Sequence, residues 1–350
     1  MKLATSIPHV GVLPCGEHGT ITDVGGVKVG HFTLERGAYQ TGVTVVLPHE
    51  NDVFMNKVPA AVSIVNGFGK SAGLVQVQEL GVLETPVALT NTFSVGAMVQ
   101  AQIRQAVAAH PEIGREWATI NPVVLECNDG TLNDIQAMVL DHEHYLAACR
   151  AASIQVAQGA VGAGRGMTCF GLKGGIGTSS RVVRMPDDRV FTVGALVLAN
   201  FGVPDALMID GEPIGRMLAG HLESFNNEQV EKGSIIMLIA TDAPLDARQL
   251  RRLSLRAAAG LAHTGSFFGH QSGDISLAFS TNYTLPEDPG APAPAVAMLH
   301  ETWLEHLFRA AADGTEQAIL NALWHAETVV GRDGNRRYGL KEILSKIPLS

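Results

Sequence analysis

The sequence has few aromatic and few charged residues. Of its 350 residues, 5% are aromatic and 17% are charged, whereas 46% are hydrophobic. Its 25 Lys and Arg are outnumbered by 34 Asp and Glu, which gives a formal net charge of −9 with no basic cluster. Nucleic acids bind to clustered positive charge, so we exclude a nucleic-acid partner. The apolar content is sufficient for one large domain or two tightly joined ones.

Long apolar runs and cysteine motifs are also missing. No run approaches the ~20 apolar residues of a membrane-spanning helix, and Pro8 interrupts an N-terminal stretch that makes a poor signal peptide. The four cysteines, Cys15, Cys127, Cys149 and Cys169, form no C-x-x-C pair and no metal-ligand spacing. We therefore expect a cytoplasmic protein with no membrane partner, no metal and no other cofactor.

Apolar periodicity predicts a mixture of strands and helices. Strands are expected at 26–34, 42–48, 60–66, 86–92, 121–127, 189–202, 233–244 and 273–283, and helices at 74–83, 94–110, 245–265, 296–314 and 315–331, with another ending near Arg150. Their order is irregular and lacks a βαβ repeat, so two sheets flanked by helices fit better than a doubly wound parallel sheet. A Pro-rich connector at 285–295 lies too late to separate domains, so residues 1–350 are treated as one domain.

Three motifs suggest chemistry but lack the context for it. Gly69–Gly73 matches the G-x-S-x-G elbow around Ser71, yet no later histidine lies in a marked turn after a strand. A Gly-rich turn that lines the site is the preferred interpretation. At 162–177 Met167 occupies the position of the last glycine of G-x-G-x-x-G, so we expect a solvated loop. The histidines of DHEHY, residues 141–145, point apart on a helix and predict no metal site.

Gly233 and Ser234 stand directly before an apolar run that predicts a buried strand. A turn is the simplest interpretation, because both residue types are common in turns. The alternative is a nucleophile. A serine without a histidine can use its own α-amine as a base when it begins a chain, since that amine has a pKa of about 7.7–8.0.

Ser234 is internal and would become N-terminal only if the bond before it were cut. Gly233 has no Cβ to block attack by the Ser234 hydroxyl on its carbonyl, and it tolerates a strained backbone. The ester formed by this N→O shift would be hydrolysed by water. The remaining polar clusters lie near strand ends, at Asn200, at Ser272 with Asp274, and in the loop that carries Glu126 and Asn128.

Segments along nearly the whole chain resemble one enzyme family. They include ITDVGGVKVGH, TPVALTNTFSVG, ECNDGTLNDI, ANFG, KGSIIMLIATDAPL, AHTGSFFGHQSGDISLAFST and TEQAILNALWHAETVVGRDG. Together and in this order they resemble the L-aminopeptidase/D-esterase and β-aminopeptidase family. The resemblance implies an α+β fold, a four-layer αββα sandwich like that of N-terminal-nucleophile hydrolases. It also implies self-cleavage into subunits 1–233 and 234–350 that stay together, and a homo-oligomer, a tetramer of such heterodimers.

The resemblance also implies roles for individual residues. Ser234 would be the nucleophile, with Ser272 and Asp274 as its hydrogen-bonding and electrostatic partners. Asn200 would donate to the oxyanion, and Glu126 would hold the ammonium group of the substrate.

Two positions depart from the family pattern. Some members have a tyrosine in the loop after Glu126, where this chain offers Asn128 or Thr131, and Tyr145 lies too far along to replace it. Asp274 stands where some β-aminopeptidases have Glu, so their substrate preference does not transfer directly.

The expected function is a self-processing serine aminopeptidase that hydrolyses small peptides, amides or esters through an acyl-enzyme on Ser234. One alternative is an acyltransferase of the ornithine-acetyltransferase type, although such proteins usually present Thr at the cleavage point. The other alternative is a non-catalytic oligomeric binding protein.

Overall fold

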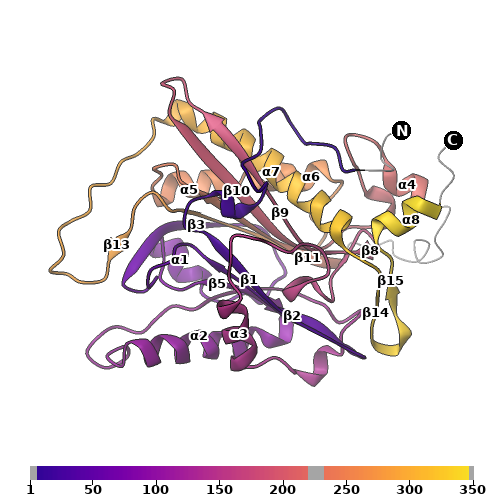
Figure 1. Cartoon of the computed structure of the whole chain (residues 1–350), viewed down its shortest axis with the longest axis horizontal. Coiled ribbons are helices and arrows are strands. Elements are labelled where there is room, and N and C mark those ends of the chain that lie inside the picture. Colours follow the sequence, from indigo (N-terminus) through magenta and orange to yellow (C-terminus); the bar gives the residue numbers. More distant parts are fainter. Residues whose placement is uncertain (1–5, 220–231, 347–350) are drawn as a thin grey trace.

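Two β-sheets lie face to face, with helices on both outer sides (Figure 1). The computed structural model describes residues 6–219 and 232–346, so the first five residues of the N-terminal stretch lie outside it. The first sheet has the order β1 (Lys28–Arg36), β2 (Tyr39–Leu47), β5 (Val87–Asn91), β6 (Val123–Cys127). The second has the order β13 (Leu285–Pro286), β3 (Asn56–Gly67), β12 (Gln271–Ser280), β11 (Lys232–Thr241), β10 (Val190–Asn200), β9 (Gly175–Arg184), and β4 (Val82–Leu83) pairs with β3.

The helices form the two outer layers. In Figure 1, α2 (Val95–Ala109) and α3 (His142–Arg150) lie below the first sheet, and α5 (Ala247–Ser254), α6 (Ala257–His263) and α7 (Leu304–His325) lie above the second. The shorter elements are α1 (Leu74–Leu80), α4 (Ile214–Ala219), α8 (Leu340–Lys346), β7 (Thr168–Cys169), β8 (Leu172–Lys173), β14 (Val329–Val330) and β15 (Arg336–Arg337). No helix within the described residues is both long enough and apolar enough to cross a membrane.

Strand alternation builds a separate core between each pair of layers. On β11, Ile236 and Leu238 face the first sheet, whereas Ile235 and Met237 pack beneath the helices α5, α6 and α7. On β5, Ala88 faces α2 and α3, while its neighbours in the strand face the second sheet. The result is four layers, helix–sheet–sheet–helix, which confirms the predicted α+β sandwich.

The prediction for residues 162–177 was wrong. The expected solvated loop at 162–177 is largely buried and contains β7, β8 and the start of β9. We missed β9 because its sequence, GIGTSSRVVR, is rich in Gly, Ser and Arg. Gly177 on this strand is needed for packing, because a Cβ there would lie 1.9 Å from the carbonyl oxygen of Ala318 on α7.

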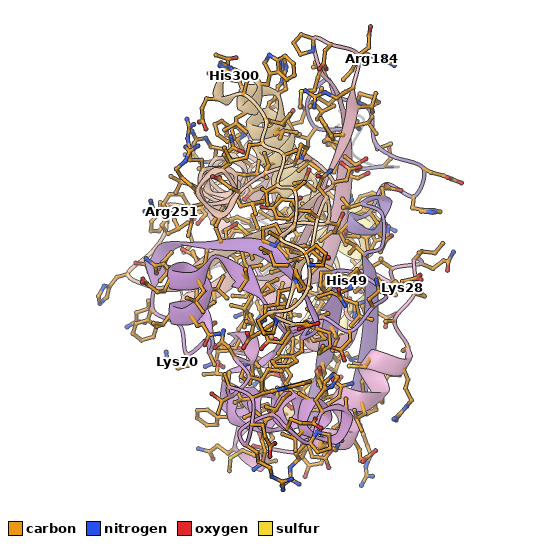
Figure 2. The ribbon with its side chains drawn as sticks, turned by 90° about the vertical axis from the view of Figure 1, so that its left-hand side faces the viewer. Lys28, His49, Lys70, Arg184, Arg251 and His300 are labelled. Atoms are coloured by element: carbon orange, nitrogen blue, oxygen red, sulfur yellow. The ribbon has the colours of Figure 1, made fainter. Side chains whose placement is uncertain are left out.

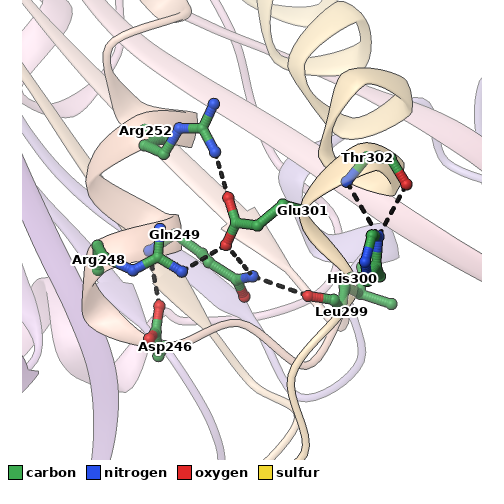
Figure 3. A network of polar contacts seen from close by, with 8 residues as sticks. All are labelled: Asp246, Arg248, Gln249, Arg252, Leu299, His300, Glu301 and Thr302. Atoms are coloured by element: carbon green, nitrogen blue, oxygen red, sulfur yellow. Dashed lines mark hydrogen bonds and ion pairs between the residues drawn. The ribbon is translucent and has the colours of Figure 1, made fainter.

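The helical boundaries also differ from the prediction. The segment 245–265 forms two helices, α5 and α6, and the two helices expected at 296–331 are one helix, α7, that begins at Leu304 and continues through Gly314. Asp246 is the N-cap of α5, where its carboxylate accepts the N–H of Gln249 at 2.7 Å. Glu301 connects the segment before α7 to α5 (Figure 3). Its carboxylate accepts hydrogen bonds from Arg248, Gln249 and Arg252.

Candidate active site

Ser234 lies near the start of β11, between two neighbouring strands. Its register partners are Asn200 on antiparallel β10 and Gly273 on parallel β12. The Ser234 hydroxyl donates to the carbonyl oxygen of Gly233 at 2.7 Å and accepts the backbone N–H of Gly273 at 3.2 Å. The side chain is 5% exposed. The hydroxyl of Ser234 is therefore held against the carbonyl group of the preceding residue.

Gly233 occupies a backbone position that only glycine fits. Its φ is +141°, which L-residues rarely adopt, and a Cβ there would lie 2.0 Å from the carbonyl oxygen of Asn200. The close approach of β10 therefore requires this glycine. It also fixes the direction of the peptide bond between Gly233 and Ser234.

The side chain of Asn200 is held at both ends of its amide. Its Oδ1 accepts the backbone N–H of Thr168 at 2.8 Å, and its Nδ2 donates to the carbonyl oxygen of Asn128 at 3.1 Å. These two partners determine which way the amide points. Because Nδ2 carries two hydrogens, one remains for another acceptor. Asn200 is 6% exposed.

Glu126 is the penultimate residue of β6 and is almost completely buried, at 2% exposure. Its Oε1 accepts the backbone N–H of Lys70 at 2.8 Å, and its Oε2 accepts the hydroxyl of Thr92. The side chain of Lys70 itself is exposed (Figure 2). A Cβ built on Gly69 would lie 3.7 Å from Glu126 Oε1 and 3.9 Å from the Cα of Gly273. The Gly-rich turn therefore lies between the carboxylate of Glu126 and Gly273, whose N–H is hydrogen-bonded to Ser234.

Ser272 and Asp274 form a buried pair on the next strand. The Ser272 hydroxyl donates to Asp274 Oδ1 at 2.5 Å, and both side chains are 0% exposed. They flank Gly273, whose Cβ, if present, would lie 3.0 Å from Ser234 Oγ. Alternation along β12 therefore turns Ser272 and Asp274 toward the face opposite to the Ser234 hydroxyl. The contact between β12 and Ser234 Oγ is made by the backbone of Gly273.

The side chains of three other candidates, Asn128, Ser71 and Tyr145, form no hydrogen bond with Ser234 within the described residues. The exposed side chain of Asn128 accepts the N–H of Gly130 at 2.8 Å, so its backbone carbonyl is the group that reaches Asn200. Ser71 lies before α1, and its hydroxyl has no hydrogen-bond partner among the described residues. Tyr145 lies on α3 and packs in the outer core, where its hydroxyl donates to Gln105 of α2 at 3.0 Å.

The sequence did not reveal the main-chain donors of this site. The N–H groups of Gly273, Lys70 and Thr168 contact Ser234, Glu126 and Asn200 respectively. Any residue type except Pro supplies an N–H, so residue identity gives no signal for such a role. Thr92 could have been noticed, because it follows the strand that ends at Asn91.

Cys127 contacts the main chain of Ser234. Its thiol donates to the carbonyl oxygen of Ser234 at 3.4 Å. Complete burial and the carboxylates of Glu126 and Asp274 raise the pKa of this thiol well above its usual value. It therefore stays protonated and serves as a hydrogen-bond donor. Within the described residues no group of three or more His, Cys, Asp or Glu could hold a metal ion.

Comparisons with known proteins show the family of this chain. The model of peptidase family S58 matches residues 19–337. The β-peptidyl aminopeptidase BapA of Sphingosinicella microcystinivorans is 40% identical over 341 residues, covering 91% of this chain and 84% of that protein. A β-aminopeptidase structure from Burkholderia sp. is 40% identical with a TM-score of 0.88, covering 96% of this chain and 95% of that chain.

A third relative identifies the fold. The L-aminopeptidase D-Ala-esterase/amidase of Ochrobactrum anthropi is described as a prototype for the serine aminopeptidases and a new variant of the Ntn hydrolase fold. It is 35% identical with a TM-score of 0.89, covering 97% of this chain and 95% of that chain. These relatives support an aminopeptidase rather than the acyltransferase or the non-catalytic alternative. The chain belongs to peptidase family S58 and is a hydrolase of the aminopeptidase type.

Proposed function

We propose that the chain cleaves itself between Gly233 and Ser234, and that Ser234 then acts as an N-terminal nucleophile. The observation that carries the proposal is the hydrogen bond from Ser234 Oγ to the Gly233 carbonyl oxygen at 2.7 Å. Attack on the adjacent carbonyl carbon transfers the acyl group of Gly233 from nitrogen to oxygen. Water then hydrolyses the ester and leaves a free α-amine on Ser234.

The freed α-amine is the general base of the proposed reaction. It takes the hydroxyl proton of Ser234 as the oxygen attacks the substrate carbonyl, and it returns a proton to the leaving amine. The remaining N–H of Asn200 donates to the oxyanion, and its fixed amide needs no reorganisation for this. Water releases the acyl group and regenerates the serine.

Glu126 selects substrates that carry a free N-terminal amine. An ammonium group is strongly hydrated, and burying it is costly unless a carboxylate compensates its charge. The carboxylate of Glu126 is buried and fixed by Lys70 and Thr92, with Gly69 between it and Gly273. Its fixed position sets the distance between the substrate ammonium and the bond that Ser234 attacks. The site thus favours removal of single N-terminal residues.

Asp274 acts on the new terminus rather than on the hydroxyl. Its carboxylate is fully buried, and Ile235, the residue after Ser234, is its register partner. A protonated α-amine released at Ser234 supplies a counter-charge for this carboxylate. The hydroxyl of Ser272 fixes the carboxylate of Asp274 in place.

The proposed substrates are small peptides, amides or esters with a free amine, including β-amino acyl groups, since two of the relatives are named for β-peptides. We further propose that the two subunits stay together, because β10 and β11 pair along eight residues on opposite sides of the cut. Assembly into a tetramer of heterodimers and a cytoplasmic location remain predictions.

Paired substrates test this function. An amino acid p-nitroanilide with a free amine should be hydrolysed, whereas its N-acetylated form should not. Glu126→Gln should raise KM for the free-amine substrate and leave self-cleavage intact, because cleavage involves no substrate amine. Equal hydrolysis of the blocked and free substrates would contradict the aminopeptidase selectivity and would leave a general amidase.

A further inference from the structure

Lys173 is a buried ammonium group close to the candidate active site. It lies on β8, it is 0% exposed, and Nζ donates to the carbonyl oxygens of Gly164 at 2.9 Å, Met167 at 2.8 Å and Gly174 at 2.7 Å. A lysine ammonium has three donors. All three hydrogens therefore have a main-chain acceptor, and these acceptors come from one segment, 164–174.

The three carbonyl groups belong to buried residues. Without the ammonium, each carbonyl would lose a charge-assisted hydrogen bond, although the oxygens of Gly164 and Met167 would each keep one backbone N–H donor. Lys173 therefore links three points of segment 164–174, which folds back on itself as the β7–β8 hairpin. A second bond, from the N–H of Gly174 to the oxygen of Met167 at 3.0 Å, closes the same segment.

One peptide group connects Lys173 to Asn200. The carbonyl of Met167 accepts from Lys173, and the N–H of the same peptide group, which belongs to Thr168, donates to Asn200 Oδ1 at 2.8 Å. A peptide group is planar and rigid. The ammonium of Lys173 and the N–H of Gly174 both bind the oxygen at one end of this plane, and together they hold the direction of the N–H at the other end.

We infer that Lys173 is a positioning residue, which holds the amide of Asn200 in the orientation that the oxyanion requires through the Met167–Thr168 peptide group. The inference rests on the proposed role of Asn200 as the oxyanion donor. Lys173 itself touches neither the substrate nor Ser234. Its charge contributes as well, because a cation on the carbonyl oxygen polarises the peptide group and strengthens its N–H as a donor.

The surroundings of Lys173 are compatible with a charged side chain. Burial lowers its pKa well below the usual value, and the nearby Arg165 acts in the same direction. Asp129 opposes this effect and raises the pKa. Three carbonyl acceptors match the ammonium form, whereas the neutral amine has only two hydrogens to donate.

A double-mutant cycle tests the inference. Lys173→Met should lower kcat roughly 10- to 100-fold with little change in KM, because a displacement of about 1 Å at a catalytic group costs rates of this order. In an Asn200→Ala background the same change should lower kcat less than about threefold, since the group on which Lys173 acts is gone. Rates are normalised to the fraction of chain cleaved, which intact mass measures.

Arg181 provides the matched control. It is a second buried cation, 1% exposed on β9, that donates to the carbonyl oxygens of Ser180 at 2.7 Å and Val10 at 2.8 Å. Arg181→Met should lower the thermal unfolding midpoint. Any loss of kcat that it causes should be the same in the wild-type and the Asn200→Ala backgrounds. If Lys173→Met does not fold, Lys173→Arg can replace it in the test. Arginine keeps the positive charge but cannot place one nitrogen against the three carbonyl oxygens. The kcat of this variant should also fall only when Asn200 is present.

Two outcomes would overturn the inference. Equal losses of kcat from the Lys173 variant in the wild-type and the Asn200→Ala backgrounds would show that Lys173 acts by another route. Normal turnover of Asn200→Ala alone would instead contradict the proposed oxyanion role, and the basis of the inference with it. The two failures are distinguishable because the second appears in the single variant.

Discussion

The backbone N–H of Gly273 donates to Ser234 Oγ at 3.2 Å across two parallel strands. The hydroxyl of Ser234, the proposed nucleophile, is therefore oriented by the main chain of a neighbouring strand. Both strands belong to the same sheet and pair over ten residues from Lys232 to Thr241. This hydrogen bond is present in the uncleaved chain, so the hydroxyl of Ser234 is already oriented before the proposed self-cleavage.

Gly273→Ala should impair both self-cleavage and turnover. A Cβ at this position would lie 2.8 Å from the carbonyl oxygen of Phe68 and 3.0 Å from Ser234 Oγ, so one of them must move. Initial rates and intact mass over time would measure the loss, which we expect to exceed tenfold in kcat, on the order of the cost of a misplaced catalytic group. Gly25→Ala is the control, since a Cβ there has no neighbour within 4 Å. Equal rates in the two variants would contradict the account.

Gly233→Ala should give a chain that remains uncleaved or fails to fold. The φ of +141° strains any L-residue, and the new Cβ would meet the Asn200 carbonyl oxygen at 2.0 Å. Gly96→Ala, on α2 with free space around it, should cleave normally. Mass spectrometry and circular dichroism separate the cleavage defect from the folding defect. Normal cleavage of Gly233→Ala would show that this glycine is dispensable.

Asn200→Ala should reduce kcat by about 10²–10³ with little effect on KM, as is typical when one oxyanion donor is lost. Substrate binding should survive, because the proposed partner of the substrate ammonium is Glu126, a different residue. Steady-state kinetics at several substrate concentrations separate the two constants. If Asn200→Ala changed only the thermal stability, the role of Asn200 would be to hold β7 at Thr168 and the loop at Asn128 in place.

Asp129 should make the stability of the fold depend on pH. Its carboxyl is 0% exposed, and burial raises its pKa from the ordinary 3.8 to about 7. A raised folded-state pKa contributes stability that is full below about pH 4 and is lost as the pH rises through 7. Asp129→Asn should therefore gain stability relative to the wild type between pH 5 and pH 8. Thermal unfolding at both pH values tests this, and a constant difference would contradict the raised pKa.

Much of the fold was predictable because nearly continuous apolar runs mark buried strands such as β10 and β11. The order of the sheets and the position of Ser234 between Asn200 and Gly273 could not be predicted, because pairing is decided by contacts between distant segments. Strand β9 was not predicted, because its small residues give no apolar pattern. They allow α7 to pack closely against the strand. Similarly, Gly314 was taken as the end of a helix, yet α7 continues through it and the Ser179 hydroxyl donates to its carbonyl at 2.6 Å.

The candidate site was predictable in its side chains but not in its main-chain donors. Resemblance to a family pointed to Ser234, Asn200 and Glu126, which the fold brings to one region. Resemblance did not reveal that Ser272 and Asp274 face away from the Ser234 hydroxyl, because that depends on alternation at Gly273. Lys173 gave no signal either, since a lysine in a Gly-rich segment usually indicates a solvated loop.

Intact-mass analysis of freshly purified protein tests the central claim most directly. The account predicts that wild-type chain converts into two pieces, residues 1–233 and 234–350, with the smaller piece beginning SIIML. Ser234→Ala should remain a single chain without activity. Wild-type protein that stays full length while hydrolysing a free-amine substrate at its full rate would contradict the account, because an internal Ser234 has no α-amine to act as a base.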